Sequence, residues 1–73
     1  MAKGEKNAVY RVTEVIGTSA NSWEDAARNA VKVASKSLRD LRIAEISKLD
    51  VKIEDGKITQ FRARLALSFK YDS

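Results

Sequence analysis

Residues 22–41, SWEDAARNAVKVASKSLRDL, decide the fold of this chain. Apolar side chains recur there at intervals of three and four residues, which match one side of an α-helix. The apolar positions are Trp23, Ala27, Ala30, Ala34, Leu38 and Leu41. Charged and polar side chains fall on the opposite side. The pattern predicts an amphipathic helix that packs against a sheet and ends between Leu38 and Leu41.

The start of this helix carries signals of its own. Ser22 followed three residues later by Asp25 resembles a capping box, and Asn21 is the alternative cap. Residues 17–21, GTSAN, precede the helix and are typical of a turn, in which Gly17 is free to take a positive φ.

Three strand-like segments surround the helix. Residues 8–16 are rich in β-branched and aromatic side chains, with apolar groups on both faces. Residues 42–54 alternate imperfectly, because the apolar positions change parity midway. Either a β-bulge or a strand whose second half faces another subunit explains this change. Asp55-Gly56 favours a two-residue type I′ hairpin turn, and residues 57–71 alternate most cleanly, as the central strand of a sheet should.

Pairing outward from this turn without a bulge gives an explicit register. It sets Ile46 opposite Leu65 and Ala44 opposite Leu67 in a core that faces the helix. It puts four aliphatic side chains on the face away from the helix: Leu49, Val51, Ile53 and Ile58. With a right-handed crossover, the predicted fold is α+β, with β-α-β-β order and a three-stranded antiparallel sheet of order 1-3-2 packed on one helix.

Size and strand length both point to self-association. The 73 residues form one domain, 1–73, in which we expect residues 1–7 to be flexible, and a domain this small without cysteine needs stabilisation from elsewhere. A strand of ~14 residues spans about 46 Å, whereas a helix of ~18 residues spans about 27 Å. One helix leaves part of such a strand uncovered, so we expect a closed homo-oligomer.

The composition excludes several classes of function. The chain has no His and no Cys, which removes imidazole and thiolate catalysis and the common zinc sites, and no catalytic constellation is evident. We therefore expect no enzyme. No stretch resembles a membrane span or a signal peptide, so we expect a cytoplasmic protein that does not contact membranes. The net charge is +4, but the basic and aromatic side chains of the last strand lie on opposite faces, which argues against nucleic-acid binding.

Two carboxylates and one Trp are the candidates for ligand chemistry. Glu45 is predicted opposite Ala66 with Arg64 as a diagonal neighbour, which suits either a charge pair at a subunit contact or a ligand site. Glu14 lies mid-strand and is either solvated or paired, or an oxygen ligand for a hard cation gathered around a symmetry axis. Trp23 is expected to pack in the core or an interface, the alternative being a stacking platform for a cofactor.

Several of these segments together resemble the dodecin family. They are YRVTEVIGTS at 10–19, the helix, LRIAEI at 41–46, and a long Asp-Gly hairpin ending in LALSF at 65–69. The likeness spans nearly the whole chain. It implies a hollow homododecamer that binds flavins and is not known for catalysis.

The resemblance also assigns an altered ligand pocket. Dodecins typically carry W-x-E-V at the start of the second strand, where the Trp stacks on the flavin and the Glu follows two residues later. Ile43 and Glu45 stand at those two positions here, and Arg62 replaces a Gln that hydrogen-bonds the flavin. Two functions stay open: storage of a weakly held flavin (riboflavin, FMN or FAD) around Ile43, Glu45 and Arg62, or a structural or cation-binding assembly in which Glu14 and Glu45 hold calcium or magnesium.

Overall fold

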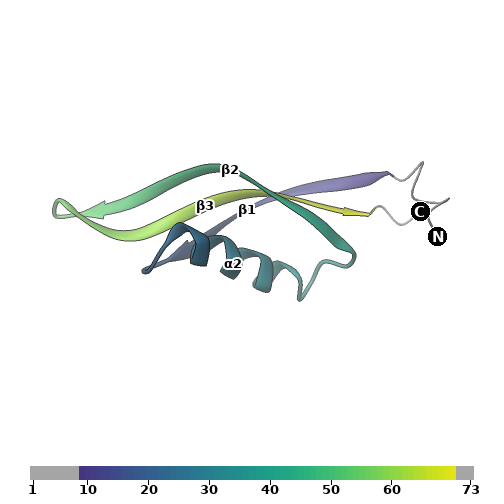
Figure 1. Cartoon of the computed structure of the whole chain (residues 1–73), viewed down its shortest axis with the longest axis horizontal. Helices are drawn as coiled ribbons and strands as arrows, with labels where there is room; N and C mark the ends of the chain where they lie inside the picture. Colours follow the sequence, from purple (N-terminus) through teal and green to yellow (C-terminus); the bar gives the residue numbers. More distant parts are fainter. Residues whose placement is uncertain (1–8, 71–73) are drawn as a thin grey trace.

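The computed structural model describes residues 9–70. It has the predicted element order: β1 (Tyr10–Ser19), α2 (Trp23–Ala34), β2 (Leu41–Glu54) and β3 (Lys57–Lys70). The sheet is antiparallel with order β1-β3-β2, so β3 is central, as its clean alternation predicts (Figure 1). The first seven residues, expected to be flexible, lie outside the described part. The predicted fold class is confirmed.

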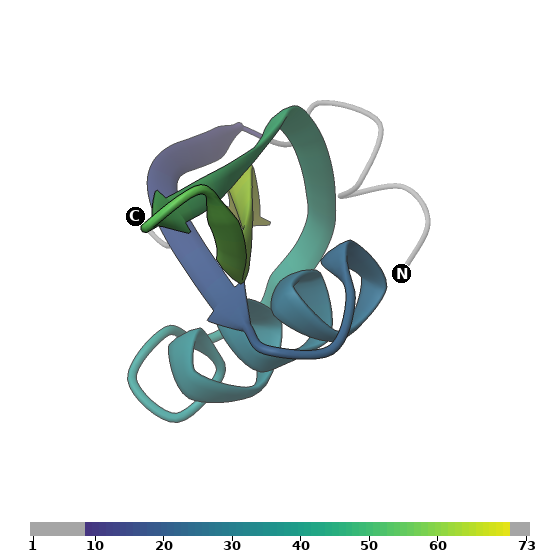
Figure 2. The same ribbon diagram turned by 90° about the vertical axis from the view of Figure 1, so that its left-hand side faces the viewer.

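One face of the sheet packs on α2, and the other face has no layer over it among residues 9–70 (Figure 2). The buried core comes from α2 and β3 alone: Ala26, Ala30, Ala34, Ala63, Leu65 and Leu67. The stripe predicted for the helix included Ala27 but not Ala26. The structure buries Ala26 completely and leaves Trp23 39% exposed, because the helix turns its smallest side chains toward the sheet.

The helix is shorter than its apolar pattern predicts. It begins at Trp23 with Ser22 as N-cap, whose Oγ accepts from the Asp25 amide at 3.0 Å, so the predicted cap is confirmed. It ends at Ala34 rather than between Leu38 and Leu41. The Ser35 hydroxyl bonds back to the Lys32 carbonyl at 3.0 Å, a side-chain bond that competes with continued helix. Leu38 and Leu41 still pack against the core, but from the segment beyond the helix.

Gly17 lies inside β1 rather than in a turn, and the positive φ expected there is wrong. Among the described residues, positive φ occurs at Asp40, Asp55 and Gly56. Gly17 is needed for a different reason, because β1 crosses close beneath α2. A Cβ at this position would collide with the Ala26 carbonyl oxygen and lie 2.8 Å from the Ala30 Cβ.

The hairpin turn and most of the predicted register are confirmed. Asp55 and Gly56 have φ values of 53° and 75°, as a type I′ turn requires. Ile46 pairs with Leu65, and Ala44 pairs with Leu67.

Two bulges shift the register between these points. Ser47 is an extra residue on β2 and Thr59 is an extra residue on β3. Each hydroxyl donates to a carbonyl of the facing strand, Ser47 to Arg64 at 3.1 Å and Thr59 to Lys52 at 3.4 Å. The bulge, one of the two explanations left open by the sequence, is confirmed.

The bulge corrects one expectation about the sheet faces. Leu49 pairs with Ala63 and Val51 pairs with Phe61, and directly opposed residues share a face. Because Ala63 is buried beneath α2, Leu49 and Val51 lie on the helix side of the sheet. Ile53 follows by alternation, and Ile58 follows because it pairs with Ile53. Their predicted position on the opposite face is wrong. The extra residue Ser47 reverses the alternation of β2, so the odd-numbered residues that follow it lie on the helix side of the sheet.

Strands β2 and β3 are longer than the helix, as expected. β2 and β3 have 14 residues each and α2 has 12, so the strands span about 46 Å against about 18 Å for the helix. The part of the hairpin from Leu49 to Ile58, here called the hairpin arm, extends past the start of α2 (Figure 1). Its aliphatic side chains are 50–62% exposed at Leu49, Ile53 and Ile58.

Candidate functional site

The sheet face opposite α2, here called the open sheet face, carries most of the charged side chains of the strands. Ala63, Leu65 and Leu67 point into the core, so the intervening residues of β3 point the other way. By pairing, the open sheet face comprises Tyr10, Val12, Glu14, Ile16, Thr18, Ile43, Glu45, Lys48, Asp50, Lys52, Gln60, Arg62, Arg64, Ala66, Ser68 and Lys70.

The two carboxylates proposed as cation ligands flank one small residue. Glu14 of β1 and Glu45 of β2 both pair with Ala66 of the central strand. Their backbones are therefore two strand spacings apart, about 10 Å. Within residues 9–70, no three acidic side chains come together as a metal-binding group. One chain thus supplies two separated carboxylates, and further ligands would have to come from other copies.

Arg64 pairs with Glu14 rather than with Glu45. Its Nη1 lies 3.6 Å from Glu14 Oε1, and both side chains are well exposed. Exposed ion pairs contribute little to stability, about 0–1 kcal/mol. The sequence correctly sets Glu45 opposite Ala66 and near Arg64, but it does not identify Glu14 as the partner of that arginine.

Arg62 is held by Asp50. Its Nε donates to Oδ1 at 2.7 Å and its Nη2 donates to Oδ2 at 3.1 Å. The hydrogen bond from Arg62 lowers the pKa of Asp50 below its usual value and raises the pKa of Arg62. This pair cannot be predicted from the sequence pattern, because a straight hairpin would set Arg62 opposite Leu49. The bulge at Thr59 shifts the register by one residue and moves Asp50 into that place.

A single chain does not gather all three residues of the predicted flavin pocket. Ile43 and Glu45 lie two residues apart on the same face of β2, and Ile43 is 58% exposed. Ile43 pairs with Ser68 while Arg62 pairs with Asp50. Ser68 and Arg62 are six residues apart on β3, so Arg62 is about 20 Å from Ile43 along the strand.

Trp23 packs on β3 outside the buried core and does not approach Ile43. Its ring meets Phe61 edge-on, with centroids 5.2 Å apart and planes at 75°. Its Nε1 donates to the Asp50 carbonyl at 3.0 Å, which gives the indole the acceptor expected for a packed Trp. These contacts hold the start of α2 against the base of the hairpin arm on the helix side of the sheet.

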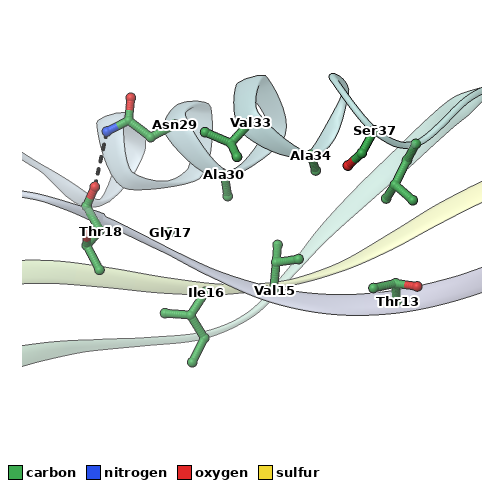
Figure 3. A pocket seen from close by; sticks show the side chains of 11 residues that line it. Thr13, Val15, Ile16, Gly17, Thr18, Asn29, Ala30, Val33, Ala34 and Ser37 are labelled. Carbon is green, nitrogen blue, oxygen red and sulfur yellow. Dashed lines mark hydrogen bonds between the residues drawn. The ribbon is translucent and has the colours of Figure 1, made fainter.

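A cavity of about 500 Å³ lies between β1 and α2 (Figure 3). Val15 points toward the helix there, while Ile16 points to the open sheet face. Asn29 Nδ2 closes one end by donating to the Thr18 carbonyl at 3.1 Å. No charged side chain lines this cavity, so it suits an apolar group rather than a phosphate or a metal ion.

Over the part of the chain that the structure describes, no helix is long and apolar enough to cross a membrane.

Comparison with known proteins gives consistent matches over nearly the whole chain. The profile of the Dodecin family matches residues 9–72. Calcium dodecin of Mycobacterium tuberculosis is 45% identical over 64 residues, which cover 86% of this chain and 89% of that protein. Its crystal structure, described as that of a calcium-chelating immunodominant antigen with a novel calcium-binding site, superposes with a TM-score of 0.78 at 43% identity, covering 88% and 91% of the two chains.

The dodecin of Streptomyces coelicolor agrees more closely in shape. It gives a TM-score of 0.86 at 42% identity, covering 92% of this chain and 96% of that chain. Dodecins form oligomeric assemblies and bind small ligands. A match across 64 of 73 residues, together with these superpositions, shows that the chain is a member of the dodecin family.

Proposed function

We propose that this protein is a non-enzymatic dodecin that assembles into a closed homo-oligomer and sequesters a divalent cation, calcium in the first instance. The observation that carries the proposal is the pair of carboxylates on the open sheet face, Glu14 and Glu45, astride Ala66. A relative that is 45% identical bears the name calcium dodecin. Calcium takes six to eight oxygen ligands, so carboxylates repeated by symmetry are suitable donors.

The residue at the flavin-stacking position argues against a flavin as the main cargo. Ile43 offers no aromatic face, and Trp23 is on the other side of the sheet, bonded to the Asp50 carbonyl. Loss of stacking removes about 1 to 3 kcal/mol per face. At about 1.4 kcal/mol per factor of ten, two faces together lower flavin affinity by several powers of ten.

Calorimetric titration of calcium into the metal-free assembly tests this function. We expect saturable binding that Glu14→Gln and Glu45→Gln each weaken at least about tenfold, which corresponds to about 1.4 kcal/mol. Glu54→Gln is the matched control, because Glu54 is an exposed strand carboxylate beside Lys52 on the hairpin arm. Unchanged calcium affinity in both test variants would reject the two carboxylates as ligands.

A parallel titration of riboflavin, FMN and FAD, followed by flavin fluorescence, tests the rival cargo. We expect little quenching at micromolar protein and restored binding in Ile43→Trp. Strong quenching by the unmodified protein would make flavin the cargo instead.

The size and location of the assembly are part of the proposal. Twelve copies of an 8.1 kDa chain give about 97 kDa, which light scattering distinguishes from a trimer or a hexamer. The expected location is the cytoplasm, testable by fractionation of the native host.

A further inference from the structure

The hairpin arm presents an apolar face that its own chain leaves uncovered. Leu49, Val51, Ile53 and Ile58 share this face, on the same side of the sheet as α2. The helix begins at Trp23, which contacts the base of the arm at Phe61 and the Asp50 carbonyl. Beyond that contact no described element of the chain packs over the arm, and Ile53 and Ile58 remain 62% and 57% exposed.

A second uncovered apolar surface lies between α2 and β2. The core residues come from α2 and β3, so the helix sits over β3 and leaves an open trough beside β2. The trough has a volume of about 550 Å³. Its lining is apolar at the bottom and charged at the rim: Ala27, Val31, Ala44, Ile46 and Leu65, with Glu24, Arg28 and Lys32 above them. Ile46 is 50% exposed there although it lies on the helix side of the sheet.

We propose that the hairpin arm of one copy docks in the α2–β2 trough of the next copy. The inference rests on the homo-oligomer in the proposed function, and it names the surfaces that meet. An arm cannot fill the trough of its own chain, because it is the part of β2 and β3 that extends past the start of α2, away from the helix (Figure 1). A second copy can cover both surfaces, because its arm can fill the trough of the first copy and its trough can receive the arm of another.

Area and charge agree with this occupant. The chain exposes 5612 Å², whereas a monomeric protein of 8.1 kDa exposes about 4,500 Å². The difference of about 1,100 Å² is enough for two modest contact patches on each copy, one at the arm and one at the trough, where a standard interface buries roughly 800 Å² per partner. The tip of the arm carries Lys52, Glu54, Asp55 and Lys57, and the rim of the trough carries Glu24, Arg28 and Lys32, so both edges hold charges of both signs that can pair across a contact. Contacts of opposite charge at the edge of an interface guide association and fix orientation.

The arm is held in shape before it docks. Trp23 fixes its base, and the bulge at Ser47 keeps the apolar residues on one face. Little ordering is therefore needed on association, which favours tight contact. The interface is heterologous, since different surfaces of the two copies meet. Repetition of such a contact produces a ring when its rotation closes.

Cysteine cross-linking of the intact assembly tests the contact, and the chain has no native cysteine to interfere. The test variant combines Ile58→Cys on the arm with Val31→Cys in the trough. The matched control combines Ile58→Cys with Val33→Cys, because Val33 is an exposed valine two residues away on the opposite flank of α2. Disulfides form only when the two Cα atoms come within about 7 Å.

After oxidation, we expect the Val31 pair to give a ladder of covalent species above the dimer on a denaturing, non-reducing gel. Each single variant and the Val33 pair should stay at or below the dimer. A Val31 pair that gives no ladder, or a Val33 pair that does, overturns the proposed contact while leaving the oligomer intact. If Val31→Cys prevents assembly, Ile46→Cys in the same trough takes its place.

Light scattering before oxidation distinguishes failure of the proposed homo-oligomer from failure of the proposed docking contact. A monomeric unmodified protein would reject the homo-oligomer of the proposed function itself. An intact oligomer without the ladder would reject only the docking of arm in trough.

Discussion

Gly17→Ala tests the close crossing of β1 beneath α2. An added Cβ collides with the Ala26 carbonyl oxygen and lies 2.8 Å from the Ala30 Cβ. The carbonyl belongs to the helix backbone, so relief requires the helix to move and the alanine core to open. Overpacking of this kind costs about 1–3 kcal/mol or more. Reduced entropy of the unfolded chain returns about 0.4–1 kcal/mol. Because the clash is with helix backbone, we take the upper end of this cost, about 3 kcal/mol, and expect a net loss of about 2 kcal/mol in the free energy of unfolding.

Gly56→Ala is the matched control for this substitution. Its Cβ would meet no atom within 4 Å, and only its φ of 75° opposes an alanine. A left-handed residue costs about 1–2 kcal/mol, again partly offset in the unfolded chain, so the net loss should be at most about 1.5 kcal/mol. Urea unfolding followed by circular dichroism at one fixed protein concentration gives both values.

A second substitution separates the two contacts at Gly17. Ala30→Gly removes the methyl contact but not the clash with the Ala26 carbonyl, so it should rescue Gly17→Ala only in part. Wild-type stability in Gly17→Ala, a greater loss in Gly56→Ala, or full rescue by Ala30→Gly would each refute the reasoning.

Three further substitutions test contacts around the helix and the arm. Trp23→Phe removes the indole donor to Asp50 and should lower the free energy of unfolding by about 0.5–1.5 kcal/mol, measured by circular dichroism because the only Trp is lost. Asp50→Asn should lower the melting temperature at neutral pH. The hydrogen bond from Arg62 depresses the pKa of Asp50, so the higher melting temperature of the wild type is present above pH 3.8 and disappears as the pH falls below it. Ser22→Ala should cost about 1 kcal/mol by removing the acceptor for the Asp25 amide, and Ser22→Asn should retain most of that.

Each of these three has a result that would contradict it. For Trp23→Phe it is unchanged stability. For Asp50→Asn it is a deficit in melting temperature that persists in acid, when the wild-type carboxyl is also neutral. For Ser22→Ala it is a loss equal to that of Ser22→Asn, because the cap bond would then contribute nothing.

The sequence predicts the architecture well because each element carries a local pattern. The capping serine, the Asp-Gly turn and the alternation of β3 specify the helix start, the hairpin and the central strand without long-range information. The length of the helix is less predictable, since an apolar residue such as Leu38 can reach the core from a loop as well as from a helix.

The candidate site is less accessible from sequence because it depends on register. A single unpaired residue, Thr59, decides that Asp50 rather than Leu49 faces Arg62, and Ser47 restores the original register beyond that pair. The change of apolar parity along β2 indicates an irregularity in the strand or a change in what covers it. A bulge and a contact with another subunit produce the same pattern, so the sequence does not distinguish them. Residues that would complete a site from another chain, around Ile43 or Glu45, leave no trace in the spacing of one sequence.

Ser47 and Thr59 also define where the hairpin can change in length. Each is left out of the ladder, so deletion of either one leaves every other pair of β2 and β3 in place. Deletion of a paired neighbour such as Lys48 would instead shift the residues beyond it to new partners. Because a bulge bends its strand, a one-residue deletion at Ser47 or Thr59 would re-aim the arm. A change of one residue at either bulge can therefore alter the direction in which the arm points without disturbing the rest of the sheet.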